Sequence, residues 1–255
     1  RIAESVQCYV ALQHKPTQVL SGLLLNFLYW KQHAPPMSLS LSQILTLLLC
    51  WLAYAVLHSL LASLWLKRAV AARWPRLAPG YRLAFNVLAV VLLVPPLWLT
   101  VAWRGPLLWS WDGGWAWVAN GLALAAVGGF VWSTRYYDMA VFAGSAQWAT
   151  RNGAAEDPGG LRLSPLHRHV RHPWYSLGLL ILWTRDMDEA RLVSALCITL
   201  YLWLGSLLEE RKLLAFHGEA YARYRERVPG LVPWPGRSLS ADEARALCTS
   251  PQRAV

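Results

Sequence analysis

The sequence predicts an all-α fold: an integral membrane bundle of about five transmembrane helices with a cytoplasmic amphipathic C-terminal helix. Three observations lead to this prediction. The 255 residues are 56% hydrophobic and only 15% charged, with a mean hydropathy of +0.30, whereas soluble domains carry about 25% charged residues. Several uncharged runs reach the roughly 20 residues that a helix needs to cross a bilayer. The 16 Trp residues suit the boundary between hydrocarbon and headgroups.

Three uncharged runs are long enough for membrane spans: Leu39 to Leu66 with 28 residues, Leu83 to Trp103 with 21, and Gly113 to Thr134 with 22. Two shorter runs, Pro173 to Thr184 and Leu192 to Leu208, have 12 and 17 residues and flank a polar stretch at 185–191. We expect these two runs to form a helical hairpin with a charged tip, as the fourth and fifth helices of the bundle.

The charges between the runs predict the orientation, because short cytoplasmic loops collect Lys and Arg. The first loop, 67–82, holds five basic residues and no acid, whereas the second loop, 104–112, is nearly neutral. The third loop and the C-terminal segment are again basic. We therefore expect these basic segments in the cytoplasm, the protein in a bacterial inner membrane, and the net charge of +10 to reflect topology. Nucleic acid is not expected as a partner.

The first 36 residues differ from the rest of the chain. Thr17 to Trp30 is an uncharged run of 14 residues, which suits a signal-peptide core or an interfacial segment better than a span. The first Met, Met37, directly precedes Ser38 and the first long run. We expect Met37 to be the true start, residues 1–36 to be a foreign or misassigned leader, 37–233 to be the membrane domain and 234–255 to be a C-terminal tail.

After Leu208 the pattern becomes that of an amphipathic helix. Apolar and aromatic residues recur at intervals of three and four, with basic residues mostly between them. The recurring residues are Leu213, Leu214, His217, Tyr221, Tyr224 and Val228. Pro229 and Gly230 end the pattern. We expect a basic helix that lies at the cytoplasmic interface or caps the bundle.

No metal site is expected, although the segment LHRHVRHPWYSLG at 166–178 holds three His residues. Their spacings of two and three match no standard ligand pattern, the segment has no Cys or carboxylate, and its Arg residues repel a dication. The four Cys residues form no C-x-x-C pair; they are Cys8, Cys50, Cys197 and Cys248. A basic loop facing lipid headgroups explains the Arg residues, but Pro173 followed by Tyr175 and Gly178 is typical of a rigid helix start.

Two further features indicate chemistry inside or beside the membrane. Glu209 and Glu210 are adjacent carboxylates at the end of an apolar run, and ionisable groups at a membrane boundary are functional candidates, with interfacial anchoring as the alternative. His58 lies in the first long run beside Ser59. A polar side chain in a span more often makes a hydrogen bond between helices than it catalyses a reaction.

Two separated motifs resemble the membrane methyltransferase superfamily in identity and order. They consist of RHPWY at 171–175, Glu209–Glu210 about one hairpin later, and then Phe216, Gly218, Tyr221, Tyr224, Val228, Pro229 and Pro233. The resemblance covers about residues 161–233; the superfamily includes isoprenylcysteine carboxyl methyltransferases, phospholipid N-methyltransferases and bacterial small-thiol methyltransferases. HSLLAS at 58–63, Lys67 and YRLAFN at 81–86 resemble the bacterial methanethiol S-methyltransferases and a related branch associated with nitric-oxide reduction.

The resemblance implies that residues 37–233 are a membrane methyltransferase domain that binds S-adenosylmethionine at the cytoplasmic end of the bundle. It implies cofactor contacts for Leu161, Arg162, His167, His172, Pro173, Trp174, Tyr175 and Glu209. His167 stands where many relatives have Tyr. Because adjacent residues of a helix point about 100° apart, we expect Glu209 to face the cofactor and Glu210 not to.

The residue four positions before Glu209 bears on the identity of the methyl acceptor. The prenylcysteine enzymes carry an Arg four residues before the cofactor Glu, where it resembles a clamp for a substrate carboxylate, and this chain has Gly205 there. A small neutral or thiol acceptor is therefore favoured. A thiol must lose its proton before it attacks. His58 and Asp138 are the two candidate bases, and the positive charge of the cofactor is an alternative means of favouring the thiolate.

These features together lead to a prediction of the reaction. We expect an S-adenosylmethionine-dependent methyltransferase that acts in the lipid bilayer on a small hydrophobic thiol, such as methanethiol giving dimethyl sulfide. Methylation of a prenylcysteine or a phospholipid is the first alternative, favoured by a tunnel open to the bilayer. A non-catalytic membrane partner or a transporter on the same scaffold is the second, and it predicts no cofactor binding.

Overall fold

The computed structural model describes residues 37–151 and 161–249. Contacts within the chain divide it into two compact units, 1–38 and 39–255, and the helices and strands of the described residues lie in the second unit. The prediction that residues 1–36 are a leader falls outside the described residues. So does the end of the predicted tail, at 250–255.

Four helical stretches of the described residues are long and apolar enough to cross a membrane: Leu41–Ala62, Pro75–Ala102, Gly114–Tyr136 and Glu189–Arg227. Only 11–17% of their most apolar windows is buried inside the protein, so most of this apolar surface requires lipid. The chain is therefore an integral membrane protein with a helical bundle, as predicted. A fifth apolar helix, α9 (Pro173–Trp183), has 11 residues, so the count of five membrane spans remains a prediction.

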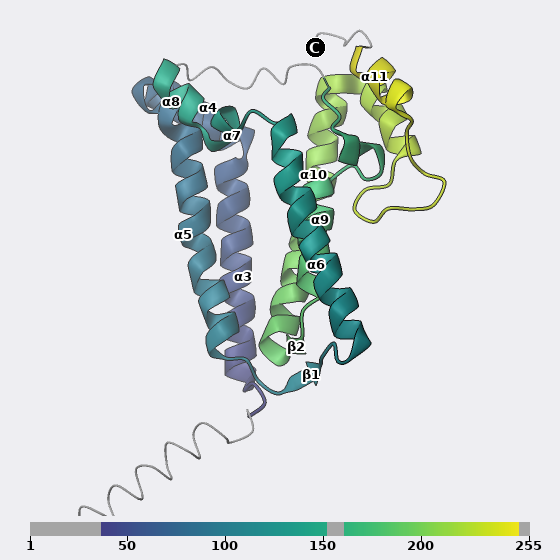
Figure 1. The fold of residues 1–255 in the computed structure, drawn as a ribbon. Coiled ribbons are helices and arrows are strands. Elements are labelled where there is room, and N and C mark those ends of the chain that lie inside the picture. Colours follow the sequence, from purple (N-terminus) through teal and green to yellow (C-terminus); the bar gives the residue numbers. More distant parts are fainter. Residues whose placement is uncertain (1–36, 152–160, 250–255) are drawn as a thin grey trace, which may run out of the picture. The chain divides into compact units, whose positions relative to one another are not determined.

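The bundle is built from two helix pairs that are joined by one long helix (Figure 1). Helix α3 (Leu41–Ala62) packs on α5 (Tyr81–Ala102), and α6 (Gly114–Ser133) packs on α9. Helix α10 (Glu189–Arg227) contacts α3, α5 and α9. The α3, α5 and α10 contact contains one core cluster, formed by Leu47, Trp51, Leu99 and Ala190.

Polar side chains strengthen this contact within the apolar region. The indole N–H of Trp51 donates to Oγ of Ser194 at 2.9 Å. The hydroxyls of Ser194 and Thr100 lie 2.6 Å apart, and Thr100 donates to the carbonyl of Pro96 at 2.7 Å. A buried hydroxyl is costly without a partner, so this chain of hydrogen bonds favours one arrangement of α3, α5 and α10.

The first apolar run is not one helix. Ser63 has extended backbone angles, ends α3, and accepts the N–H of Leu66 to begin α4 (Leu64–Arg73). Ser is favoured at such a cap because its hydroxyl replaces a missing backbone partner. The 3₁₀ turn η1 (Pro75–Gly80) then leads into α5. The 28-residue run predicted as one span is therefore a 22-residue helix followed by a separate basic helix.

The predicted hairpin of two shorter runs is present. Helix α9 ends at Trp183, and α10 begins at Glu189 after its N-cap Asp188, whose carboxylate accepts the N–H of Arg191 at 2.8 Å. Between them, β2 (Met187–Asp188) pairs antiparallel with β1 (Leu107–Trp109). This small ladder joins the α5–α6 and α9–α10 connections at one end of the bundle (Figure 1).

Short elements gather at the other end of the bundle. They are η2 (Thr134–Tyr136), α7 (Met139–Ala143), α8 (Ser145–Thr150) and η3 (Pro165–Arg168). Gly144, between α7 and α8, has a φ of 90°, and a Cβ there would come within 2.6 Å of the Leu83 backbone nitrogen. Glycine is therefore required where this segment approaches α5.

The C-terminal region is more ordered than its sequence indicates. Helix α10 is interrupted at Gly218, where φ is 51° and ψ is −126°, a region that only glycine adopts readily. Beyond this break, one buried core cluster comprises Leu161, Tyr221, Tyr224, Val228, Leu239 and Ala244. Residues 241–249 form α11 (Ala241–Thr249). The segment expected to be a tail thus contributes Leu239 and Ala244 to a buried core. The sequence analysis did not predict α11, because a helix of nine residues has too weak a pattern.

Candidate active site

The RHPWY motif begins α9 and is held by the backbone that follows α10. Pro173 occupies the first turn of α9, where its fixed φ suits a helix start. The N–H of Arg171 donates to the carbonyls of Pro229 and Gly230 at 2.9 and 3.1 Å, and the N–H of His172 donates to that of Gly230 at 3.2 Å. Residues distant in sequence therefore position the motif as firmly as its own helix does.

Arg171 and Glu210 form a largely buried ion pair behind the motif. Two guanidinium nitrogens of Arg171 lie 2.8 and 2.7 Å from Oε1 of Glu210, and the side chains are 13% and 7% exposed. Arg171 also donates to the carbonyls of Arg225 and Val228. This one side chain thus connects the motif, the middle of α10 and the end of α10.

His172, Tyr175 and Glu209 form a second cluster. The rings of His172 and Tyr175 are stacked, with centroids 5.4 Å apart and planes 10° apart. Glu209 Oε2 lies 3.4 Å from Nδ1 of His172 and accepts from the hydroxyl of Tyr175 at 3.3 Å. Nε2 of His172 faces Oε1 of Glu210 at 3.1 Å. His172 therefore lies between the two carboxylates, and the Glu209 side chain is 48% exposed.

A cavity of about 490 Å³ opens beside this cluster, and we call it the motif cavity. Its size lies within the range of about 300–1,000 Å³ that is usual for small-molecule sites. Its lining carries cationic groups and one carboxylate as well as apolar and aromatic side chains. It is lined by His58, Ala62, Lys67, Arg82, Phe85, Asn86, Ala89, Tyr137, Phe142, His167, Arg171, His172, Pro173, Trp174, Tyr175 and Glu209.

Most of the residues predicted to contact the cofactor meet at this cavity. His167, His172, Pro173, Trp174, Tyr175 and Glu209 all line it. Arg162 lines a smaller cavity of about 280 Å³, which shares Arg82, Tyr137, Phe142 and His167 with the motif cavity. The side chain of Leu161 is instead buried in the C-terminal core cluster. Cofactor contacts of each of these residues remain predictions.

The two candidate bases differ in their surroundings. Asp138 is the N-cap of α7, and its Oδ1 accepts the N–H groups of Ala140 and Val141 at 3.0 and 3.1 Å. It lines the smaller cavity and not the motif cavity. His58 lines the motif cavity, and its Nδ1 lies 2.6 Å from the hydroxyl of Tyr201. The geometry favours His58, because the Asp138 carboxylate already has a structural role.

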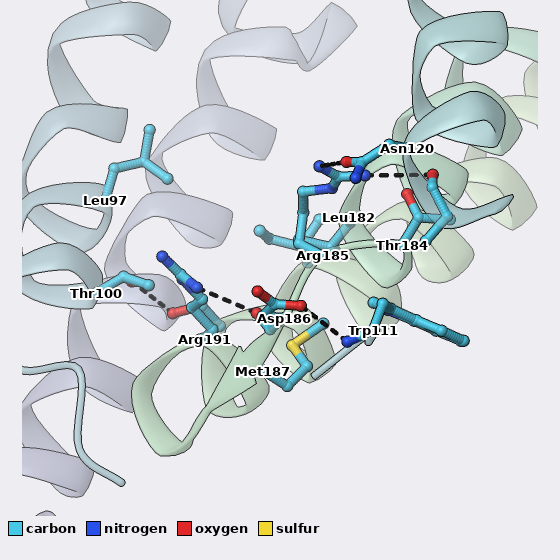
Figure 2. A pocket seen from close by; sticks show the side chains of 13 residues that line it. Leu97, Thr100, Trp111, Asn120, Leu182, Thr184, Arg185, Asp186, Met187 and Arg191 are labelled. Atoms are coloured by element: carbon cyan, nitrogen blue, oxygen red, sulfur yellow. Dashed lines mark hydrogen bonds between the residues drawn. The ribbon is translucent and has the colours of Figure 1, made fainter. Parts of the chain in front are cut away.

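A third cavity, of about 370 Å³, lies at the β1–β2 end of the bundle (Figure 2). Its charged side chains mostly bond to the protein itself: Arg185 points toward α6 and donates to Asn120 at 2.9 Å, and Arg191 donates to the carbonyl of Asp186 at 3.1 Å. None of the residues predicted for the site lines it.

No group of three potential metal ligands occurs among residues 37–151 and 161–249.

Comparison with known proteins identifies the family. Methanethiol S-methyltransferase 2 of Bradyrhizobium diazoefficiens is 32% identical over 198 residues, which cover 74% of this chain and 73% of that protein. A methanethiol S-methyltransferase of Mycobacterium tuberculosis is 31% identical over 196 residues, 72% of this chain and 75% of the relative. The chain belongs to the methanethiol S-methyltransferase family.

Other comparisons give shorter matches or none. The methanethiol S-methyltransferase of Crocosphaera subtropica is 43% identical over 72 residues, a match that spans only 28% of either chain. No family model matches the sequence. No solved structure matches it.

For this member of the methanethiol S-methyltransferase family, the structure adds several site residues that sequence reasoning did not assign. Apart from His58, the HSLLAS and YRLAFN segments supported only the resemblance, yet Ala62, Arg82, Phe85 and Asn86 from these segments line the motif cavity. Their intervals of three and four place 82, 85, 86 and 89 on one face of α5. This periodicity was the available signal. No signal in the sequence pointed to Tyr201, because a single Tyr in an apolar run is unremarkable.

His167, in the turn η3, is held as a neutral ring. Its Nδ1 accepts the backbone N–H of Ser164 at 3.2 Å and lies 2.7 Å from Oγ of Ser164. Burial, with the charge of nearby His172 adding to it, lowers the pKa of His167 to about 4. A lowered folded-state pKa means that the unfolded chain binds the proton more readily.

The stability contribution of His167 is therefore complete above its unfolded pKa of about 6.5 and is lost as the pH falls toward 4. We expect the wild-type protein to lose up to about 3 kcal/mol more than His167→Gln over this interval, because the Gln side chain can still accept from Ser164 without titrating. Melting temperatures in detergent at stepped pH measure the difference. His169→Gln, at an exposed neighbour, should retain the wild-type pH dependence. Identical profiles for wild type and His167→Gln would contradict the assignment.

Proposed function

We propose that this protein is a membrane methyltransferase that transfers a methyl group from S-adenosylmethionine to methanethiol, forming dimethyl sulfide, and that the motif cavity holds both reactants. The observation that carries the proposal is that one cavity joins the RHPWY motif and Glu209 to residues of the N-terminal half. Two relatives that this chain matches over about three quarters of their length carry the name methanethiol S-methyltransferase.

The chemistry of the cavity lining fits the methyl donor. S-adenosylmethionine supplies an electrophilic methyl group on a sulfonium and carries an ammonium and a carboxylate. Glu209, half exposed at the cavity wall, suits the cationic or ribose part. Lys67 and Arg82 line the same cavity and suit the carboxylate. The stacked rings of His172 and Tyr175 offer an aromatic surface against which a flat group can pack.

The apolar part of the lining supports a small acceptor. Ala62, Phe85 and Ala89 supply apolar surface beside His58, and Gly205 of α10 carries no side chain. A carboxylate-bearing substrate would lack the cation that the prenylcysteine enzymes place at this position. The protein mainly needs to align the sulfur nucleophile with the methyl group and exclude water, which are the usual contributions of an enzyme to such a displacement.

The proposal includes an orientation in the bacterial inner membrane. We place the motif cavity, α4 and the C-terminal segment on the cytoplasmic side, where S-adenosylmethionine is made. Support comes from the basic residues of the first loop, which are Lys67, Arg68, Arg73, Arg76 and Arg82. Such clusters mark cytoplasmic loops.

The test is a binding measurement followed by an acceptor screen on the full chain in detergent. Calorimetry with S-adenosylhomocysteine should show one saturable site. Methanethiol plus S-adenosylmethionine should then yield dimethyl sulfide, detected in the headspace by gas chromatography. A farnesylcysteine and a phosphatidylethanolamine serve as competing acceptors. Preferential methylation of either lipid-like acceptor would overturn the choice of substrate, and no binding of S-adenosylhomocysteine would overturn the enzymatic proposal as a whole.

A further inference from the structure

We propose that the acceptor thiol binds against His58, which takes up its proton, and that Tyr201 is the positioning residue that fixes His58 for this role. The inference rests on the proposed function and extends it to the acceptor subsite. His58 and Tyr201 come from α3 and α10, 143 residues apart, and their side chains meet at 2.6 Å between Nδ1 and the hydroxyl.

The imidazole ring of His58 is held on several sides. Tyr54 stacks on it with centroids 5.4 Å apart and planes 30° apart, and Phe85 approaches it at 5.1 Å. Tyr201 contacts it edge-on as well as by hydrogen bond. Of the two ring nitrogens of His58, only Nδ1 has a hydrogen-bond partner among the described residues, and the side chain lines the motif cavity. A ring oriented at one nitrogen and open at the other is the arrangement of a general base with an orienting partner.

The hydrogen bond to Tyr201 decides which nitrogen can act. A neutral imidazole carries one proton, so Nε2 can accept a proton only when Nδ1 carries the hydrogen. In the proposed arrangement Nδ1–H donates to the oxygen of Tyr201, and the hydroxyl of Tyr201 then donates to Oγ of Ser59, 3.4 Å away. This arrangement holds His58 in the tautomer whose Nε2 is free to accept a proton.

The acceptor space lies between this base and the carboxylate of the motif. Tyr201, Gly205 and Glu209 follow at intervals of four, on one face of α10. Eight residues at 1.5 Å each separate Tyr201 from Glu209 by about 12 Å along the helix. Gly205 stands between them and carries no side chain. We place the small thiol in the motif cavity, with its sulfur beside His58 and its alkyl group against Phe85 and Ala89, which line that cavity.

The proton transfer completes a balanced reaction. The thiol S–H bond breaks and its proton passes to Nε2 of His58. The sulfur forms a bond to the methyl carbon, while the bond from that carbon to the sulfonium breaks and leaves its electron pair on the cofactor sulfur. The thioether, S-adenosylhomocysteine and an imidazolium result, and the imidazolium returns its proton to water.

The first test compares thiols that differ in acidity. His58→Gln should lower kcat/KM for methanethiol by about 10²- to 10⁴-fold, the usual contribution of a general base. With thiophenol, an aryl thiol already largely ionised near neutral pH, the loss should shrink to less than about tenfold. Tyr201→Phe should lower kcat/KM for methanethiol by about 10- to 100-fold. An equal loss for both thiols in His58→Gln would overturn the proton-transfer role.

Tyr54→Phe is the matched control. It removes one hydroxyl from a neighbouring ring of the same cluster, and that hydroxyl has no hydrogen-bond partner in the part of the chain that the structure describes. Its loss of activity should be much smaller than that of Tyr201→Phe, because the ring that stacks on His58 is kept. A loss equal to that of Tyr201→Phe would assign the effect to packing and overturn the positioning role.

The second test does not depend on turnover. In protein with ¹⁵N-labelled His, the ring nitrogens of His58, assigned by the signals lost in His58→Gln, should report a proton on Nδ1 in the wild type and a mixture of tautomers in Tyr201→Phe. Unchanged shifts in Tyr201→Phe would overturn the tautomer argument. All three variants should bind S-adenosylhomocysteine with wild-type affinity. Failure of the proposed function would instead appear in the wild-type protein, as absence of that binding.

Discussion

Glu210→Gln is expected to destabilise the protein by about 3–5 kcal/mol, which lowers its melting temperature in detergent by about 6–20 °C. The carboxylate accepts from two nitrogens of Arg171 and faces Nε2 of His172, and its side chain is 7% exposed. Removing one member of a buried pair leaves the other charge without compensation. Arg171 would keep only the carbonyls of Arg225 and Val228.

Glu219→Gln provides a matched control on the same helix. Glu219 also faces an Arg, Arg223, at 3.8 Å, but both side chains are more than half exposed. Exposed pairs contribute only about 0–1 kcal/mol. Equal melting temperatures for the two variants would mean that the Arg171–Glu210 pair does not stabilise the contact between the motif and α10.

Glu209→Gln is expected to weaken S-adenosylmethionine binding by about 10- to 150-fold, equivalent to about 1.5–3 kcal/mol, while the melting temperature changes little. Glu209 lines the motif cavity beside His172 and Tyr175. A carboxylate that bonds to a cationic ligand loses a charge-assisted interaction when it becomes an amide. Its half-exposed side chain also lies 3.4 Å from buried His172, but unlike Glu210 it forms no ion pair with Arg171.

Calorimetry on Glu209→Gln and wild type, with melting temperatures for both, measures this difference. The two neighbouring substitutions remove the same charge but should separate affinity from stability. If Glu209→Gln left the affinity unchanged, the carboxylate would be an interfacial anchor and the cofactor contact would have to be assigned to other residues of the cavity.

The different positions of Glu209 and Glu210 were predictable in part. The 100° angle between helical neighbours indicated that only one can face a pocket, and the family resemblance pointed to Glu209. The sequence did not indicate that Glu210 would pair with Arg171. That pair forms because the segment that begins α9 packs against α10 and brings together two residues that are 39 positions apart. No local sequence pattern encodes such a contact.

The interruption at Ser63 and the packing of α11 show a similar limit. The apolar run continues through Ser63, so hydropathy alone predicts one helix, whereas the extended backbone and the Ser cap end it. The segment around α11 has few apolar residues, yet Leu239 and Ala244 are buried against Tyr221 and Tyr224. A short helix gains its burial from the partner surface, which is absent from its own pattern.

The sequence by itself determined the membrane class, three long apolar runs and the hairpin of α9 and α10, because hydropathy and helical periodicity act over neighbouring residues. Only the tertiary structure decided that His58 meets Tyr201, that the HSLLAS and YRLAFN segments share one cavity with the motif, and that Glu210 pairs with Arg171 behind this cavity. These contacts join residues 39 to 143 positions apart. They depend on the shapes and polar groups of whole helices fitting together, which no single stretch of sequence contains.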